Sequence, residues 1–146
     1  MNEENDFKEF EEHYVKKFLP QYYLFSPRYG YIVWRLGTGE NVELLHVRSF
    51  IPRQGIGTRL VRAMLRELMK NKPYYSIFGF TLANNVIARQ WYHSMGFNTQ
   101  ECGGPYKGDK SAIFWRSFEV LCEKLLKDDD GDPELMQNVI KSENLK

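Results

Sequence analysis

One stretch, residues 43–69, constrains the fold of this chain more than any other. It begins with the short apolar run Glu43–Val47, which has the composition of a β-strand. From Ile56 onward apolar residues recur at helical spacing, while basic residues dominate the opposite face. Two glycines, Gly55 and Gly57, lie where the strand must turn into the helix. The sequence therefore predicts a strand, a glycine turn and an amphipathic helix in direct succession.

This arrangement suits the binding of an anion. A helix N-terminus carries unpaired backbone N–H groups and the positive end of the helix dipole. At Gly55 and Gly57 no Cβ would hold a phosphate away from those groups. A tight turn that only packs a helix against a strand is the simpler interpretation. Two nucleotide motifs are excluded, because the chain lacks a Gly-Lys-Ser/Thr run and also lacks the third glycine and the later acidic residue of the dinucleotide fingerprint.

The turn resembles the acetyl-CoA-binding motif of the GNAT family of N-acetyltransferases. That motif has Gln or Arg, two variable residues, Gly, a variable residue, and then Gly or Ala. Gly55 and Gly57 occupy the glycine positions, whereas Pro52 stands where Gln or Arg is usual. The resemblance implies that the coenzyme phosphates contact the residues of this turn, namely Arg53, Gln54, Gly55, Ile56, Gly57 and Thr58.

A second stretch, residues 85–97, strengthens the resemblance. The family's second coenzyme motif begins with Asn, has Ala three positions on, Tyr seven on, and Gly-Phe eleven and twelve on. The chain meets all five positions, with Asn85, Ala88, Tyr92, Gly96 and Phe97. Each of them also has a structural explanation, such as a helix cap, core packing or a helix end. The resemblance covers about residues 22–118 and implies that Asn85 contacts the pantetheine and that Tyr92 lies near the sulfur.

The resemblance further implies that a strand supplies backbone groups for the pantetheine and the acetyl carbonyl. By spacing, these groups belong to Leu45, His46 and Val47. The same resemblance makes Tyr92 the candidate acid that protonates the leaving thiolate, although its hydroxyl could equally form a hydrogen-bonding wall.

The base for this chemistry is left open by the sequence. An alkyl ammonium has a pKa near 10, and it must lose a proton before it can attack, so a base or a water path to one helps. Glu43 is the candidate base, because alternation places it on the same strand face as Leu45 and Val47. A surface carboxylate is an equally good interpretation of Glu43. Asn41 occupies the alternative position on the strand and cannot accept a proton, and His46 is expected on the opposite face.

The remaining patterns predict an α/β fold with a mixed, mostly antiparallel central sheet, flanking helices and a short N-terminal portion. A parallel pairing of residues 41–47 with residues 74–82 follows from the helix between them. One domain is expected over residues 1–127, with its core in residues 22–118. The acidic segment 128–146 is expected to be a mobile tail with at most one weak helix. The expected strands are 22–25, 29–36, 41–47, 74–82, 97–102 and 111–118, and the expected helices are 4–18, 56–71, 86–95 and 120–127.

Composition and charge narrow the class of protein. A hydrophobic content of 42% and a charged content of 27% are ordinary for a soluble globular protein, and no apolar run is long enough to span a membrane. Two cysteines and three histidines are scattered, so we expect a cytoplasmic protein without a metal site. Residues 27–117 hold thirteen Lys and Arg against five Asp and Glu. This basic excess suits the polyphosphate of CoA, whereas nucleic acid is a poorer fit because the basic residues follow no reading motif.

The resemblance implies an acetyl-CoA-dependent N-acetyltransferase that transfers the acetyl group directly to a primary amine of a small molecule or a protein. The alternative is a non-catalytic acyl-CoA-binding or protein-interaction module on the same fold. Most family members carry a strand and two helices before the central strands, whereas only about 21 residues precede Tyr22 here. The acceptor site is therefore expected to be reduced, open or completed by a second subunit of a homodimer. Tyr106 is a candidate on the acceptor side.

Overall fold

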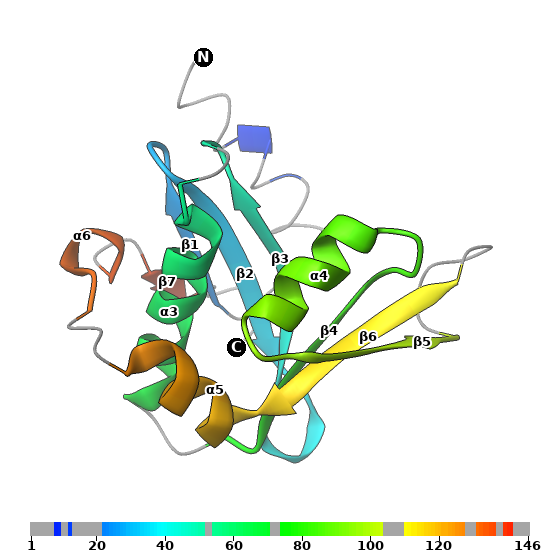
Figure 1. Ribbon diagram of the computed structural model, residues 1–146. Coiled ribbons are helices and arrows are strands. Elements are labelled where there is room, and N and C mark those ends of the chain that lie inside the picture. Colours follow the sequence, from blue (N-terminus) through cyan, green and yellow to red (C-terminus); the bar gives the residue numbers. More distant parts are fainter. Residues whose placement is uncertain are drawn as a thin grey trace. The chain divides into compact units, whose positions relative to one another are not determined.

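The computed structural model describes residues 8–9, 12, 22–51, 54–70, 74–103, 110–127, 131–136 and 139–141. The helix expected over residues 4–18 lies almost wholly outside this part, as do Pro52, Arg53 and Tyr106. The chain is α/β, with mixed, mostly antiparallel strands and flanking helices, which confirms the expected fold class (Figure 1). It divides into two compact units, one of residues 1–35, 45–71 and 131–146 and one of residues 36–44 and 72–130.

The first unit contains two strands that are rich in aromatic and aliphatic residues. β1 (Tyr22–Ser26) pairs antiparallel with β2 (Gly30–Leu36) across a tight turn in which the Tyr29 amide donates to the Ser26 carbonyl at 3.1 Å. Because side chains alternate between faces, these apolar runs bury both faces of the pair. One face holds a cluster of Tyr23, Phe25, Tyr31 and Val33, and the other holds the fully buried Leu24, Ile32 and Trp34.

Helix α3 (Ile56–Met69) completes the apolar part of this unit. Its stripe of apolar residues is buried as the helical spacing predicts, while Arg59, Arg62 and Arg66 lie on more exposed positions. The end of β3 (Asn41–Ser49) precedes it, with Leu45–Ser49 in the first unit and Asn41–Leu44 in the second. The predicted succession of strand, turn and helix is therefore confirmed.

Part of the acidic end of the chain has regular structure, and its expected mobility stays a prediction. Residues 133–136 form the short helix α6 (Pro133–Met136), and residues 139–141 form β7 (Val139–Lys141), which pairs antiparallel with β1. Leu135 is fully buried, and α6 contacts both α3 and β1 (Figure 1). A few apolar residues in a polar segment are enough for this packing, which composition alone does not reveal. The single domain over residues 1–127 stays a prediction.

The second unit contains the first part of β3, followed in the chain by β4 (Ser76–Leu82), α4 (Val86–Ser94), β5 (Asn98–Cys102), β6 (Ser111–Ser117) and α5 (Phe118–Leu126). β3 and β4 pair in parallel at Asn41↔Ser76, Val42↔Ile77 and Glu43↔Phe78, as the intervening helix predicted. β6 pairs antiparallel with both β4 and β5. α4 contacts β5 and β6, and α5 contacts β4 and β6.

Candidate functional site

The start of α3 has the geometry of an anion-binding turn. Gly55 is the N-cap residue and adopts a left-handed conformation, with φ 69° and ψ 15°. The first helical hydrogen bond runs from the Arg59 amide to the Gly55 carbonyl at 3.1 Å. The amides of Ile56, Gly57 and Thr58 precede that bond, and such amides have no partner inside a helix. Among the described residues, no atom would lie within 4 Å of a Cβ at Gly55, so glycine is favoured here by its backbone conformation.

The three longer helices in the described part of the chain differ in how they begin. Asn85 caps α4 by accepting a hydrogen bond from the Ala88 amide at 3.1 Å, which confirms the N-cap expected there. Ser117 caps α5 by accepting from the Val120 amide at 3.3 Å. At α3 the cap residue is a glycine and makes no side-chain hydrogen bond. The first amides of α3 therefore have no capping side chain from the N-cap residue, which leaves them open to water or to an anion.

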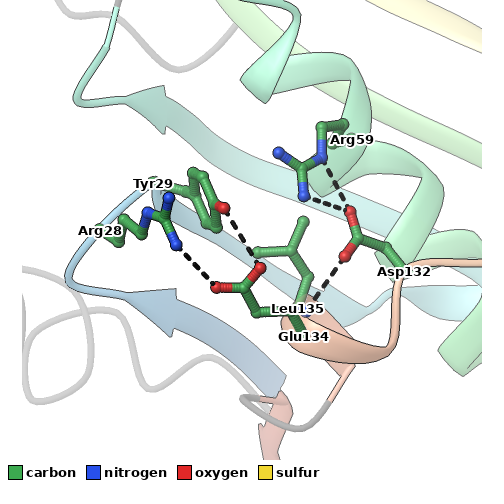
Figure 2. A network of polar contacts seen from close by, with 6 residues as sticks. All are labelled: Arg28, Tyr29, Arg59, Asp132, Glu134 and Leu135. Carbon is green, nitrogen blue, oxygen red and sulfur yellow. Dashed lines mark hydrogen bonds and ion pairs between the residues drawn. The ribbon is translucent and has the colours of Figure 1, made fainter.

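One cation of this first turn is already paired. The Arg59 guanidinium donates to the Asp132 carboxylate from Nε at 2.8 Å and approaches the same oxygen from Nη2 at 2.7 Å (Figure 2). Partial burial works to lower the pKa of Arg59, but hydrogen bonds and charge interactions with Asp132 and Tyr29 raise that pKa above its ordinary value. The pairing of Arg59 with Asp132 was not among the contacts predicted from the sequence. An Asp-Pro at the start of a short helix, three positions before the buried Leu135, was the available signal.

The strand residues that were expected to bind the pantetheine lie beside aromatic side chains. Leu45 packs against the cluster that contains Tyr31, and the His46 ring lies 5.6 Å from the Tyr31 ring, measured between centroids. Strict alternation placed His46 on the face opposite Leu45, whereas both side chains contact the same cluster. The strand therefore departs locally from two-residue alternation, as bulged strands do. Val47 is half-buried.

Glu43 lies on β3 opposite Phe78, between the buried Val42 and Leu44. Its side chain is half-buried, so alternation over this part of the strand is as predicted. Asn41, the alternative position for a base, has a structural role. Its amide donates to the Thr38 carbonyl at 2.8 Å and accepts from the Ser76 hydroxyl at 2.6 Å. A catalytic role of Glu43 remains a prediction.

Tyr92 is a core residue of the second unit. It is 8% exposed, and its ring stacks on Phe114 and meets Phe97 edge-on at 5.7 Å. Gly79 on β4 permits this packing, because a Cβ there would collide with the Phe114 ring and lie 2.6 Å from the Leu44 carbonyl oxygen. Phe114 and Gly79 were not predicted from the sequence, although a glycine inside an apolar strand is a signal of close approach. The packing favours the wall interpretation of Tyr92, and its role as an acid remains a prediction.

A hollow of about 340 Å³ lies elsewhere on the second unit. Its described lining residues are Val86, Arg89, Gln90, His93, Ser94 and Thr99. None of them belongs to the predicted site.

Within the described part of the chain, no group of three or more His, Cys, Asp or Glu side chains is placed to hold a metal ion. Among the described helices, none has both the length and the apolar character that crossing a bilayer requires.

Comparison with known proteins adds family evidence to this geometry. Residues 5–109 match the family described as an acetyltransferase (GNAT) domain. No curated protein matches the sequence.

Three solved structures have similar folds. A protein assigned to the GNAT acetyltransferases from Desulfovibrio desulfuricans is 18% identical, with 76% of each chain covered and a TM-score of 0.58. Ard1 from Thermoplasma volcanium is 20% identical, with 61% of this chain and 62% of that chain covered and a TM-score of 0.54. A protein assigned as a streptothricin acetyltransferase from Bacillus anthracis, solved with acetyl coenzyme A, is 26% identical, with 60% of this chain and 53% of that chain covered and a TM-score of 0.51. The matches thus span less than two thirds of the length of Ard1 and of the Bacillus protein.

Proposed function

This chain belongs to the GNAT acetyltransferase family, and on that premise we propose that it transfers the acetyl group of acetyl-CoA to an amine. The observation that carries the proposal is the start of α3, where a left-handed glycine without a capping side chain opens an amphipathic helix directly after a strand. The relative solved with acetyl coenzyme A supports the choice of ligand.

The coenzyme phosphates would be bound by the first turn of α3. Backbone amides of Ile56, Gly57 and Thr58 would donate to the phosphate oxygens, and the positive end of the helix dipole would add to the attraction. Gln54 and Gly55 are exposed at this turn, so an anion has access to it from solvent. We assign Arg53 the supporting role of a nearby positive charge, and the backbone of Leu45–Val47 the binding of the pantetheine and the acetyl carbonyl. Asn85, whose Oδ1 caps α4, would use its amide N–H groups for the pantetheine.

The reaction needs only a few groups. A neutral amine attacks the acetyl carbonyl, the new C–N bond forms, and the C–S bond breaks with release of the CoA thiolate. The proton lost by the amine and the proton gained by the thiolate balance overall. We propose that Glu43 accepts the proton that an acceptor ammonium must lose before it attacks, and that Tyr92 gives a proton to the leaving thiolate. The acceptor is a primary amine of a small molecule or a protein.

A binding module without turnover is the second candidate. The observation that favours it is the burial of Tyr92 between Phe97 and Phe114, because a ring held in a core needs no chemical role to be explained. In this case the protein would bind acyl-CoA with the same turn and would release no thiol.

The test compares binding with turnover on the same preparation. Calorimetry with CoA and acetyl-CoA measures binding, and thiol release in the presence of a panel of amines and amine-bearing peptides measures transfer. The proposal predicts binding together with amine-dependent thiol release. Binding without release from any amine would favour the module, and no binding of CoA at millimolar concentration would contradict both candidates.

A further inference from the structure

The end of the chain is fastened to the first turns of α3 (Figure 2). Gly131 adopts φ 98° beside the Arg66 guanidinium, and one residue later Asp132 bonds Arg59. Arg59 and Arg66 are seven positions apart on α3, which is about 10 Å along a helix. The segment 131–136, which we term the strap, therefore lies against α3, and its Asp132 bonds the side chain of Arg59 in the early part of that helix.

Asp132 uses both of its oxygens. One carboxylate oxygen receives two guanidinium nitrogens of Arg59, at 2.7 and 2.8 Å. The other lies 3.5 Å from the Leu135 amide, the position at which an N-cap residue satisfies a helix start. The side chains of Arg59 and Asp132 are only 32% and 23% exposed, so solvent screens this pair less than a typical surface pair. Because Asp132 contacts both Arg59 and the Leu135 amide, its side chain links α3 to the start of α6.

A second contact fixes the other side of the strap. The Tyr29 hydroxyl donates to Glu134 at 3.2 Å, and Arg28 approaches the same carboxylate at 3.5 Å. The Tyr29 ring also lies under the Arg59 guanidinium, with 4.6 Å between the guanidinium carbon and the ring centroid. Figure 2 shows that Tyr29 lies close to Arg59 while its hydroxyl points to Glu134. The turn between β1 and β2, the strap and α3 thus form one network.

We infer that Asp132 is a positioning residue for the coenzyme site, and the inference rests on the proposed function. The Arg59 amide makes the first hydrogen bond of α3, to the Gly55 carbonyl. Holding the Arg59 side chain therefore holds the turn whose free amides would bind phosphate. Amides that are fixed before the ligand arrives bind it without an ordering cost. The same pairing neutralises Arg59, so Arg59 acts through the backbone and does not bind the phosphates itself.

The test uses the full chain with Asp132→Asn, which keeps the shape of the side chain and removes its charge. The expected result is an acetyl-CoA Kd and KM about threefold to tenfold higher, the size that the loss of a net hydrogen-bond contribution produces. The kcat should stay at the parent value, and amide hydrogen exchange at residues 56–60 should become faster without coenzyme. Arg59→Lys keeps the charge and loses the paired N–H geometry. It should therefore also raise the acetyl-CoA Kd and KM and speed amide exchange at residues 56–60. The double variant should be no worse than the single variants, because both break one interaction.

Glu134→Gln is the matched control. It lies on the same strap, but its bonds go to Arg28 and Tyr29, and the Arg28 pair is long and exposed. We expect exchange at residues 56–60 and acetyl-CoA affinity at the parent values. This comparison separates the tie to α3 from a general loosening of the strap.

Four results would overturn the inference. A tighter acetyl-CoA complex in Asp132→Asn would show that Asp132 restrains Arg59 from binding phosphate. A lower thermal midpoint with unchanged affinity would show that the tie is structural alone, and unchanged exchange at residues 56–60 would show that the tie does not hold the turn. A parent protein that fails to bind CoA would overturn the proposed function and the inference with it, and the exchange measured without coenzyme distinguishes this failure from the others.

Discussion

The ring of Tyr92 stacks on the ring of Phe114, with their centroids 3.7 Å apart and their planes 11° from parallel. This contact uses the faces of both rings and leaves the phenol oxygen outside the stack. Removing only that oxygen therefore separates the chemistry of Tyr92 from its packing.

Tyr92→Phe should keep the CoA affinity of the parent, because the ring that stacks on Phe114 is unchanged. Turnover should fall by about a hundredfold, within the range that a positioned general acid contributes. Single-turnover kinetics with the best amine acceptor would measure the effect. Parent-like turnover would show that Tyr92 is a wall and that water protonates the thiolate.

Gly79→Ala tests the close approach of β4 to Phe114, the residue on which Tyr92 stacks. The added Cβ would meet the Phe114 ring and the Leu44 carbonyl, so we expect a loss of about 1–3 kcal/mol in the free energy of unfolding, as is typical of overpacking. Urea unfolding would measure it. Gly103→Ala is the control, because a Cβ at Gly103 would lie more than 4 Å from every atom that the structure describes beyond its chain neighbours. Equal stability of the two variants would contradict the close approach of Gly79, Phe114 and Leu44.

Leu135→Ala tests whether the end of the chain is packed. Leu135 is 0% exposed, so its truncation should cost about 2–5 kcal/mol in the free energy of unfolding. Ile87→Ala, at a position 82% exposed, should change that quantity by less than about 0.5 kcal/mol. A mobile tail would instead give two equally small changes.

Glu43→Gln tests the proposed base while it keeps the shape of the side chain. Turnover at pH 7 should fall, by about a hundredfold if proton transfer is rate-limiting. It should partly recover towards pH 9, because more of an amine with a pKa near 10 is then already neutral. CoA affinity should stay the same, since backbone groups are proposed to bind the coenzyme. A pH–rate profile that overlays the parent profile would reject Glu43 and favour a water path or His46.

The sequence predicted the elements whose signals are local and strong. The apolar stripe of α3, the Asn85 cap and the parallel pairing of β3 with β4 depend on periodicity, capping chemistry and chain connectivity, and all three are confirmed. The end of the chain was expected to be mobile because its few apolar residues lie among acidic ones. Its packing depends on contacts with α3 and β1, which lie far away in the sequence.

In the candidate site, too, features with a local sequence signal could be predicted, whereas features that depend on contacts between distant residues could not. The turn at Gly55 could be predicted because glycine is the residue that most readily adopts the left-handed backbone conformation found there. The partners of Tyr92 could not, because the stack on Phe114 depends on the register of β4 against β6 and on the missing Cβ of Gly79. The contact of His46 with Tyr31 also escaped prediction, because it requires a local departure from strand alternation.

Calorimetry on Gly57→Glu tests whether the first turn of α3 binds the phosphates of CoA. A glutamate in the first turn favours the helix through its dipole, so the variant should fold, while its bulk and charge should exclude a phosphate. We predict that the parent and Gly103→Glu, which adds the same charge at an open position, bind CoA equally. Gly57→Glu should show no detectable binding. Parent-like affinity in a folded Gly57→Glu protein would contradict the claim.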